Sequence, residues 1–161
     1  MGSGESPLGE KCLAVNEIVV HRGKNPNLVE ISISMNGVYL NTFVADGLIV
    51  ATPSGSTAYS LAAGGPIVTP DLEAFVITPI SPHTISNRPI VVSSMHDIHI
   101  QSLTPGELLD VSSDGIPLHT LSYEQRYQIT RHTRNVRMIS LKGRDYYGTL
   151  RTKLGWSGKL R

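Results

Sequence analysis

The dipeptide Asn36-Gly37 is the feature of this chain that most constrains its fold. It lies between residues 28–35 and residues 38–44, two runs in which apolar and polar side chains alternate. An Asn-Gly pair between alternating runs is the strongest short-range signal for a β-hairpin, because both residues accept the positive φ angles of a tight turn. The sequence therefore predicts a hairpin over residues 28–44.

The rest of the chain continues with short strand-like runs separated by turn residues. Ala74–Ile80 is a continuous apolar run that predicts a buried strand, and Asp114-Gly115 marks a second turn. Further strands are expected at residues 13–20 (interrupted at Asn16-Glu17), 90–92, 98–103, 108–112, 127–130 and 136–141. Short strands at this spacing predict a mainly β, β-sandwich-like domain. We expect only two helices, a short internal one after Ser56 and a C-terminal one over residues 144–154.

Size and composition exclude several classes of function. A chain of 161 residues is long enough for one domain with a hydrophobic core. The net charge of +1, with 17% charged residues, gives no field that would steer the chain to nucleic acid or to an anionic membrane. No apolar run approaches the length of about 18 residues that a membrane helix needs. The single cysteine, Cys12, rules out an internal disulfide and favours a reducing compartment, so we expect a cytoplasmic location.

The first ten residues, MGSGESPLGE, are small and polar and have no apolar core typical of a signal peptide. We expect residues 1–10 to be a tag, a linker or a loop, and the domain to occupy residues 11–161. A strand-like run begins directly afterwards, which suggests a domain cut from a longer protein.

The segment from Asp46 to Pro66, DGLIVATPSGSTAYSLAAGGP, carries the strongest functional signal. An apolar run, Leu48–Ala51, leads into a polar turn and then into a helix expected over Thr57–Ala63. Strand, turn and helix N-terminus in this order leave backbone N–H groups free to meet a ligand. The hydroxyl groups of the turn can cap that helix, which is their commoner role, or bind a polar ligand. They belong to Ser54, Ser56 and Thr57.

Three other polar sites have both a structural and a functional interpretation. Asn16-Glu17 interrupts the first strand, either as a bulge or as a pair of donors and acceptors suited to ribose hydroxyls. Asp46 precedes Gly47, where a role in a turn is the ordinary expectation. Tyr59 can belong to the core or stack on a planar base. Taken one at a time, each site favours the structural interpretation.

Several well-known catalytic motifs are absent from the sequence. It contains no HExxH, no paired cysteines and no carboxylate-rich pattern, so we expect no protein-held metal. Ser54-Gly55-Ser56 lacks the GxSxG spacing of a hydrolase, and no GxxxxGK[ST] loop is present. A nucleotide would therefore have to be bound by another scheme.

Taken together, the motifs resemble the C-terminal domain of the NAD kinases, ATP-dependent enzymes that make NADP from NAD. The resemblance runs from Leu13 to Trp156 and rests on seven segments in a fixed order. These are VNE (Val15–Glu17), ADGL (Ala45–Leu48), TPSGSTAY (Thr52–Tyr59), GGP (Gly64–Pro66), TPISPHTISNRPIVV (Thr78–Val92), SDG (Ser113–Gly115) and KLGW (Lys153–Trp156).

The resemblance implies an N-terminal α/β domain followed by this mainly β domain, with NAD bound between the two domains and at a subunit contact. It implies that Asn16 and Glu17 hold the hydroxyls of the nicotinamide-side ribose. The segment on the adenine side corresponds to Thr57, Ala58 and Tyr59.

The resemblance also implies a homodimer or homotetramer formed through this domain. Asp46 corresponds to an aspartate that reaches a ligand in the neighbouring subunit. His83 and Arg88 lie in a segment that helps to form the oligomer contact, and we assign them no direct role with the ligand.

One departure limits what the chain can do alone. The GGDGT motif of the family, whose aspartate is the base towards the adenosine 2′-hydroxyl, belongs to the N-terminal domain and is absent here. A general base must lie within hydrogen-bond reach of the proton it removes. We therefore assign no catalytic residue to this chain and predict that it does not phosphorylate NAD alone. ATP, with Mg²⁺ or another divalent cation, is the implied second substrate.

Other interpretations stay open at this point. The chain can be a non-catalytic nucleotide-binding or oligomerisation module, or the C-terminal domain of a related lipid kinase, although TPSGSTAY and the Asn-Glu pair argue against the last. The C-terminal helix can pack on its own domain or against a partner domain. Its apolar and aromatic face consists of Tyr146, Tyr147, Leu150, Leu154 and Trp156.

Overall fold

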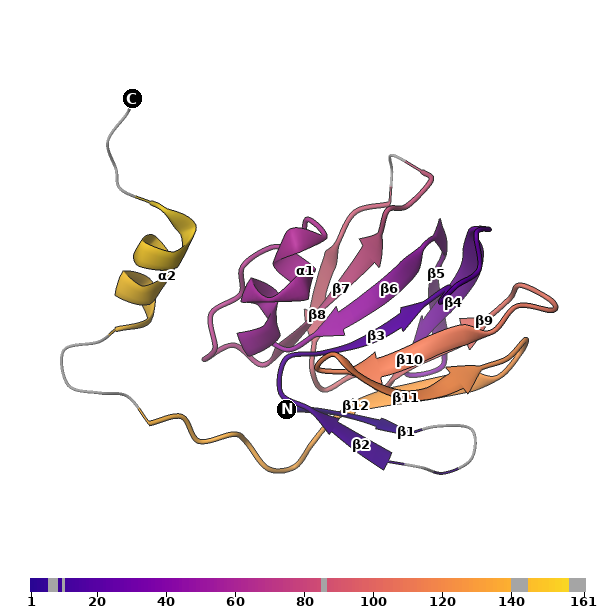
Figure 1. The fold of residues 1–161 in the computed structure, drawn as a ribbon. Helices are drawn as coiled ribbons and strands as arrows, with labels where there is room; N and C mark the ends of the chain where they lie inside the picture. Colours follow the sequence, from indigo (N-terminus) through magenta and orange to yellow (C-terminus); the bar gives the residue numbers. More distant parts are fainter. Residues whose placement is uncertain (6–8, 10, 85–86, 140–144, 157–161) are drawn as a thin grey trace.

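Two six-stranded antiparallel sheets form the body of the protein in a computed structural model (Figure 1). The structure describes residues 1–5, 9, 11–84, 87–139 and 145–156. The first sheet has the order β2 (Lys11–Ala14), β1 (Gly2–Glu5), β12 (Arg126–Arg131), β9 (Ile98–Ser102), β4 (Val29–Met35), β5 (Val38–Ala45). The second has the order β11 (Ile116–Leu121), β10 (Leu109–Ser113), β3 (Glu17–His21), β6 (Gly47–Ala51), β7 (Ala74–Ile80), β8 (Ile90–Ser93). The mainly β, sandwich-like prediction is confirmed.

The main core lies between the two sheets. Alternate residues of each strand enter it, as the period of two along a strand requires. Ile31 and Ile33 of β4 are fully buried against the second sheet's Ile18 and Val20, which belong to the same apolar cluster. The alternation in the sequence of β4 therefore corresponds to one face in the core and one face outside.

The central strands of the second sheet are buried on both faces. A smaller apolar cluster covers the outer face of this sheet and consists of Val19, Ile49, Ala51, Val68, Ala74 and Val76. The short helix α1 (Tyr59–Ala62) lies on that side, next to β6 and β7 (Figure 1). Burial on both faces explains why β6 and β7 read as continuous apolar runs in the sequence.

Both turns recognised in the sequence have the expected geometry. Asn36 and Gly37 have φ angles of 50° and 80° and join β4 to β5. Asp114 and Gly115 have φ angles of 48° and 80° and join β10 to β11. Positive φ at two successive residues is the requirement of a type I′ hairpin turn, so both turn predictions are confirmed.

Of the expectations for residues 1–10, a loop is wrong for Gly2–Glu5, which form β1 between β2 and β12. Glycine is depleted in strands, and β1 contains two glycines, so its composition did not predict a strand. Gly4 has a packing reason, since a Cβ atom there would collide with the ring of Tyr127, a fully buried core residue.

The strand expected at residues 136–141 is also not found. Residues 136–139 are in no strand, and Met138 and Ile139 are 69% and 92% exposed, while residues 140 and 141 lie outside the described residues. An apolar run becomes a strand only when a neighbouring strand offers backbone hydrogen bonds, and residues 136–139 pair with no strand. β11, in contrast, was not expected; it is an edge strand with mostly exposed side chains, and so lacks a clear apolar pattern.

The C-terminal helix α2 (Tyr146–Leu154) lies apart from the two sheets (Figure 1). The Asp145 side chain caps its N-terminus by accepting the Gly148 N–H at 2.6 Å, and Gly155 ends it with a φ of 67°. Of its predicted apolar face, Leu150 is buried, whereas Tyr147 and Trp156 are more than half exposed. Neither described helix has the length and apolarity needed to cross a membrane.

Candidate functional site

The two strongest sequence signals meet at one end of the second sheet. β3 and β6 are antiparallel, and Glu17 at the start of β3 is paired with Ala51 at the end of β6. This register places Asn16-Glu17 next to the turn that begins at Thr52. The motifs are more than thirty residues apart in sequence, and the sheet brings them into contact.

Hydrogen bonds hold the turn against the Asn-Glu pair. The Thr52 N–H donates to the Asn16 carbonyl at 2.8 Å, and the Thr52 hydroxyl donates to the Val15 carbonyl at 2.6 Å. The Gly55 N–H in turn donates to the Thr52 hydroxyl at 3.1 Å. Gly55 lies so close that a Cβ atom there would collide with the Asn16 carbonyl group, so this position of the turn requires glycine.

Asp114 joins the same corner from the turn between β10 and β11. Its carboxylate accepts the backbone N–H groups of Val15, Asn16 and Glu17 at 2.7, 2.8 and 2.9 Å. The sequence interpretation included Asp114 only as part of the SDG motif and gave it no role. An aspartate in an Asp-Gly turn is ordinary, and its partners about one hundred residues away could not be seen from local spacing.

Glu17 is the most unusual side chain at this corner. It is only 7% exposed, and the backbone N–H of Tyr59 donates to its carboxyl group. Its Oε2 atom is buried and has no hydrogen-bond partner among the described residues. Burial, followed by the negative charge of Asp114, raises the pKa of Glu17, and the Tyr59 N–H opposes this effect. A buried oxygen without a partner is costly, and Oε2 of Glu17 could accept a further hydrogen bond.

Thr57, Ala58 and Tyr59 are presented at the surface beside Glu17. Thr57 is exposed, Ala58 is half-buried, and the Tyr59 side chain is 44% exposed, so this ring lies outside the core. The structure thus brings together five of the six residues predicted to bind NAD.

The helix that follows the turn differs from the expectation. A 3₁₀ turn, η1 (Ser54–Thr57), precedes α1, with Ala58 between them, and neither element has a side-chain cap. The Ser56 hydroxyl is buried, donates to the Pro53 carbonyl at 2.6 Å and accepts the Val68 N–H at 2.9 Å. The Thr57 hydroxyl donates to the Ser54 carbonyl at 3.2 Å. The capping interpretation is therefore wrong. The Ser56 hydroxyl instead connects η1 to the backbone of Val68.

Asp46, the sixth residue, lies at the opposite end of β6. The five residues of β6 separate it from Thr52, a distance of about 20 Å for six residue steps along an extended strand. Its carboxylate accepts a bond from the Arg22 Nε at 2.7 Å, with both side chains about one-third exposed. The loop carrying His83 and Arg88 leaves β7 at this same end, and both side chains are exposed. A single chain does not bring Asp46 to the Asn-Glu corner.

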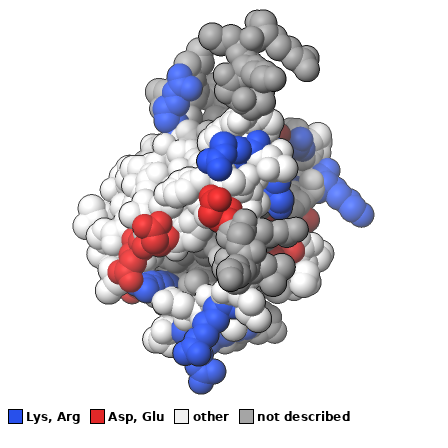
Figure 2. All heavy atoms as spheres, turned by 90° about the vertical axis from the view of Figure 1, so that its left-hand side faces the viewer, with Lys and Arg blue, Asp and Glu red and all other residues white. Residues whose placement is uncertain are grey.

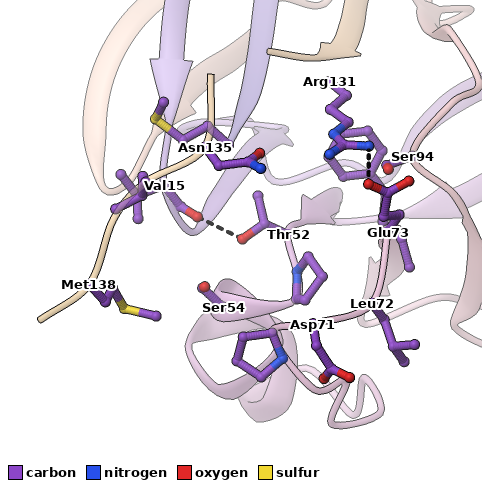
Figure 3. A pocket seen from close by; sticks show the side chains of 16 residues that line it. Val15, Thr52, Ser54, Asp71, Leu72, Glu73, Ser94, Arg131, Asn135 and Met138 are labelled. Atoms are coloured by element: carbon purple, nitrogen blue, oxygen red, sulfur yellow. Dashed lines mark hydrogen bonds and ion pairs between the residues drawn. The ribbon is translucent and has the colours of Figure 1, made fainter. Parts of the chain in front are cut away.

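A cavity of 360 Å³ lies beside the turn but does not include the predicted NAD residues (Figure 3). Thr52, Pro53 and Ser54 form part of its wall, and the ion pair between Arg131 and Glu73, with 2.7 Å between Nη1 and Oε1, forms another. Its lining contains none of the residues from Asn16 to Glu17 or from Thr57 to Tyr59. We assign it no role in NAD binding.

Charge is dispersed over the face of the molecule that Figure 2 shows. Figure 2 shows the basic and acidic side chains of one face as small separate groups on a largely uncharged surface. In the part of the chain that the structure describes, no three His, Cys, Asp or Glu side chains come together as a metal site. The Asp114 carboxylate, already committed to three N–H groups, does not fit the role of a metal ligand.

Comparisons with known proteins find relatives over nearly the whole chain. The family model described as the ATP-NAD kinase C-terminal domain matches residues 15–141. The NAD kinase of Protochlamydia amoebophila (strain UWE25) is 53% identical over 150 residues, which cover 93% of this chain and 54% of that protein. The NAD kinase of Delftia acidovorans is 43% identical over 147 residues, or 91% of this chain and 49% of that protein. The chain thus spans about half the length of these curated relatives.

Two solved structures are similar to the fold. The crystal structure of yeast NADH kinase complexed with NADH has a TM-score of 0.87 and 28% identity, and the match covers 99% of this chain and 50% of the other. An Archaeoglobus fulgidus NAD kinase in complex with ATP has a TM-score of 0.70 and 30% identity, with 83% and 51% of the two chains covered.

Proposed function

Because the chain belongs to the NAD kinase family, we propose that it is the acceptor-binding C-terminal part of an enzyme that uses ATP to phosphorylate NAD at the adenosine 2′-hydroxyl. The observation that carries this proposal is the corner at which Asn16 and Glu17 meet the Thr52–Tyr59 segment. There a buried carboxylate oxygen has no partner within the described residues, next to a half-buried amide and an exposed aromatic ring.

The side chains at the corner suit the nucleoside parts of NAD. The Glu17 carboxylate accepts hydrogen bonds from the nicotinamide-side ribose, and the Asn16 amide both donates and accepts. Thr57, Ala58 and Tyr59 line the adenine side, where the exposed Tyr59 ring offers a flat face for a base. The raised pKa of Glu17 falls when ribose hydroxyls donate to its ionised form.

The chain supplies only one part of the reaction. The base towards the 2′-hydroxyl and the glycines that approach the phosphates belong to the GGDGT motif of the family's N-terminal domain. Mg²⁺, if bound to the phosphates of ATP, would offset their charge. The described residues of this chain provide no cluster to hold it, so we assign none of them to the metal.

The proposed enzyme is a cytoplasmic homodimer or homotetramer. In it, Asp46 of one subunit reaches the nucleotide bound at the corner of the next, while His83 and Arg88 contribute to the contact between subunits. Support comes from the position of Asp46, about 20 Å along β6 from the corner of its own chain, and from the exposure of the adjoining loop.

Calorimetric titration of NAD into the chain tests the acceptor role. We expect binding, and we expect Glu17→Ala to weaken it, whereas Asp97→Asn, at an exposed position just before β9 of the other sheet, leaves it unchanged. Absence of NAD binding, both alone and with the N-terminal half of the Protochlamydia relative added, would contradict the proposal.

A second candidate is a non-catalytic nucleotide-binding or oligomerisation module. Unassisted NAD binding, with no turnover after the N-terminal half is added, would favour it.

A further inference from the structure

The segment that carries Asn16 and Glu17 has no unpaired backbone group. Asp114 accepts the three N–H groups of Val15–Glu17. Thr52 donates to the carbonyl groups of Val15 and Asn16, and the Asp114 N–H donates to the Glu17 carbonyl at 3.0 Å. A short stretch between two strands is thus fixed as firmly as a strand itself.

Asp114 contributes four of these bonds, which is more than any other residue at the corner. Three of them go to an ionised carboxylate, and such charge-assisted bonds are about twice as strong as neutral ones. The adjoining Ser113 hydroxyl adds a bond to the Leu13 carbonyl at 2.9 Å. The β10–β11 turn therefore binds the backbone of the segment that carries Asn16 and Glu17. It leaves the side chains of these two residues available to a ligand.

We propose that Asp114 is a positioning residue, which fixes the direction in which Asn16 and Glu17 meet the ribose hydroxyls of NAD. It does not touch the nucleotide and acts only through this backbone. The inference rests on the proposed function and extends it to a residue on a turn that is remote in sequence from the ligand-binding motifs.

Asp114→Asn separates this role from general support of the fold. Asp114 has a φ of 48°, a left-handed conformation that asparagine accepts as readily as aspartate, so the turn is kept. The amide oxygen can retain the bonds that Oδ1 receives from Asn16 and Glu17. The amide nitrogen, however, would face the Val15 N–H in place of Oδ2, donor against donor. The negative charge near Glu17 is lost as well.

The experiment uses the full-length enzyme with steady-state kinetics for both substrates. We expect Asp114→Asn to lower kcat/KM for NAD by about 10-fold, the scale of one lost charge-assisted bond, and to leave KM for ATP within about twofold. Asp114→Ala, which removes all three acceptor bonds, should lower kcat/KM for NAD further. Asp97→Asn is the matched control, an exposed aspartate just before β9 of the other sheet, where the Asp97 backbone is hydrogen-bonded to Asn36.

A pH profile adds a readout that loss of packing alone would not move. The groups facing the Glu17 carboxyl are Asp114 and, from α1, Tyr59; β6 on the other side has no ionisable residue. Because the Asp114 charge raises the pKa of Glu17, its removal should shift the acid limb of kcat/KM for NAD to lower pH.

The possible outcomes are distinct. A folded Asp114→Asn enzyme with wild-type kcat/KM for NAD and an unmoved acid limb would overturn the positioning role alone. Equal losses for NAD and ATP, with an unmoved acid limb, would also overturn it and indicate a purely structural residue. If the wild-type enzyme makes no NADP, the proposed function fails and this inference fails with it, which the wild-type arm shows before any variant is measured.

Discussion

The two ends of β6 are built in different ways. At the Thr52 end, three segments far apart in sequence lock together, and the corner contains a buried carboxylate. At the Asp46 end, one partly exposed ion pair to Arg22 and an exposed loop form the surface. A rigid corner suits a ligand held by its own chain, whereas an open end suits contact with another molecule. The same strand therefore connects two regions with different expected functions.

The largest effect on stability and NAD binding is expected from Gly55→Ala, which disrupts packing at the Thr52 end of β6. The new methyl group would collide with the Asn16 carbonyl group, so the turn must move away from the Asn-Glu pair. We expect a loss of about 1–3 kcal/mol in the free energy of unfolding, together with NAD binding too weak to detect by calorimetry. Gly2→Ala is the control, since its Cβ would meet only an ordinary contact with Phe75 at 3.6 Å. Unchanged NAD binding in Gly55→Ala would show that the corner is not rigid.

Removing the ligand-facing groups should have the next largest effect. In a complete enzyme, Asn16→Ala and Glu17→Ala should each weaken NAD binding by about 1–3 kcal/mol, because hydrogen bonds to the ribose are lost. The measurement is KM for NAD, with KM for ATP as the internal reference. If both variants keep the wild-type KM and turnover, NAD is not held at this corner.

A substitution at the Asp46 end of β6 should change activity only through the contact between subunits. Asp46→Ala breaks the exposed ion pair with Arg22, which is worth no more than about 1 kcal/mol of stability. Full-length Asp46→Ala and Glu17→Ala enzymes, each impaired, should regain part of their activity when their subunits are mixed, since some sites then combine intact residues from both. Mixtures no more active than the separate variants would argue that the two ends do not serve a shared site.

The pH dependence of stability should report on Glu17. Its pKa in the folded chain is raised above the ordinary value of 4.5, so the folded state binds the proton more tightly than the unfolded state. The stabilisation is fully present below that ordinary value and is lost as the pH rises through the folded pKa. Glu17→Gln should therefore unfold at a higher temperature than wild type at neutral pH, yet bind NAD more weakly. A lower unfolding temperature for Glu17→Gln at neutral pH would contradict the raised pKa.

Cys12→Ser, remote from both ends, should have the smallest effect. The Cys12 thiol contacts the Tyr127 hydroxyl at 3.2 Å, a contact that a serine hydroxyl can also make. We expect a change in unfolding free energy below about 1 kcal/mol and no change in NAD binding. A loss of NAD binding would mean that the first sheet takes part in the site.

Local signals in the sequence were enough to predict most of the fold. The two Asx-Gly turns fix their own geometry, and the continuous run of β7 directly reflects burial on both faces. β1 was missed because a strand containing Gly2 and Gly4 depends on Tyr127, which lies more than 120 residues away. The strand expected at residues 136–141 has the apolar content of a strand, yet its described part, residues 136–139, pairs with no other strand.

The candidate site could be predicted only where its residues form motifs. Asn16, Glu17 and the Thr52–Tyr59 segment were found from the sequence, and the sheet register then explains why they meet. Asp114 was missed because its role consists of three backbone bonds made across the fold. Ser56 was misread as a cap, since nothing local reveals that the Val68 segment buries it.

The most direct test of the account is NADP formation by the 161-residue chain with ATP and Mg²⁺, measured alone and after addition of the N-terminal half of the Protochlamydia relative. The chain is proposed to hold the NAD acceptor but to lack the base, so we expect no NADP from the chain alone and measurable NADP once that half is present. NADP formation by the chain alone would contradict the account, because it would place the catalytic base among these residues.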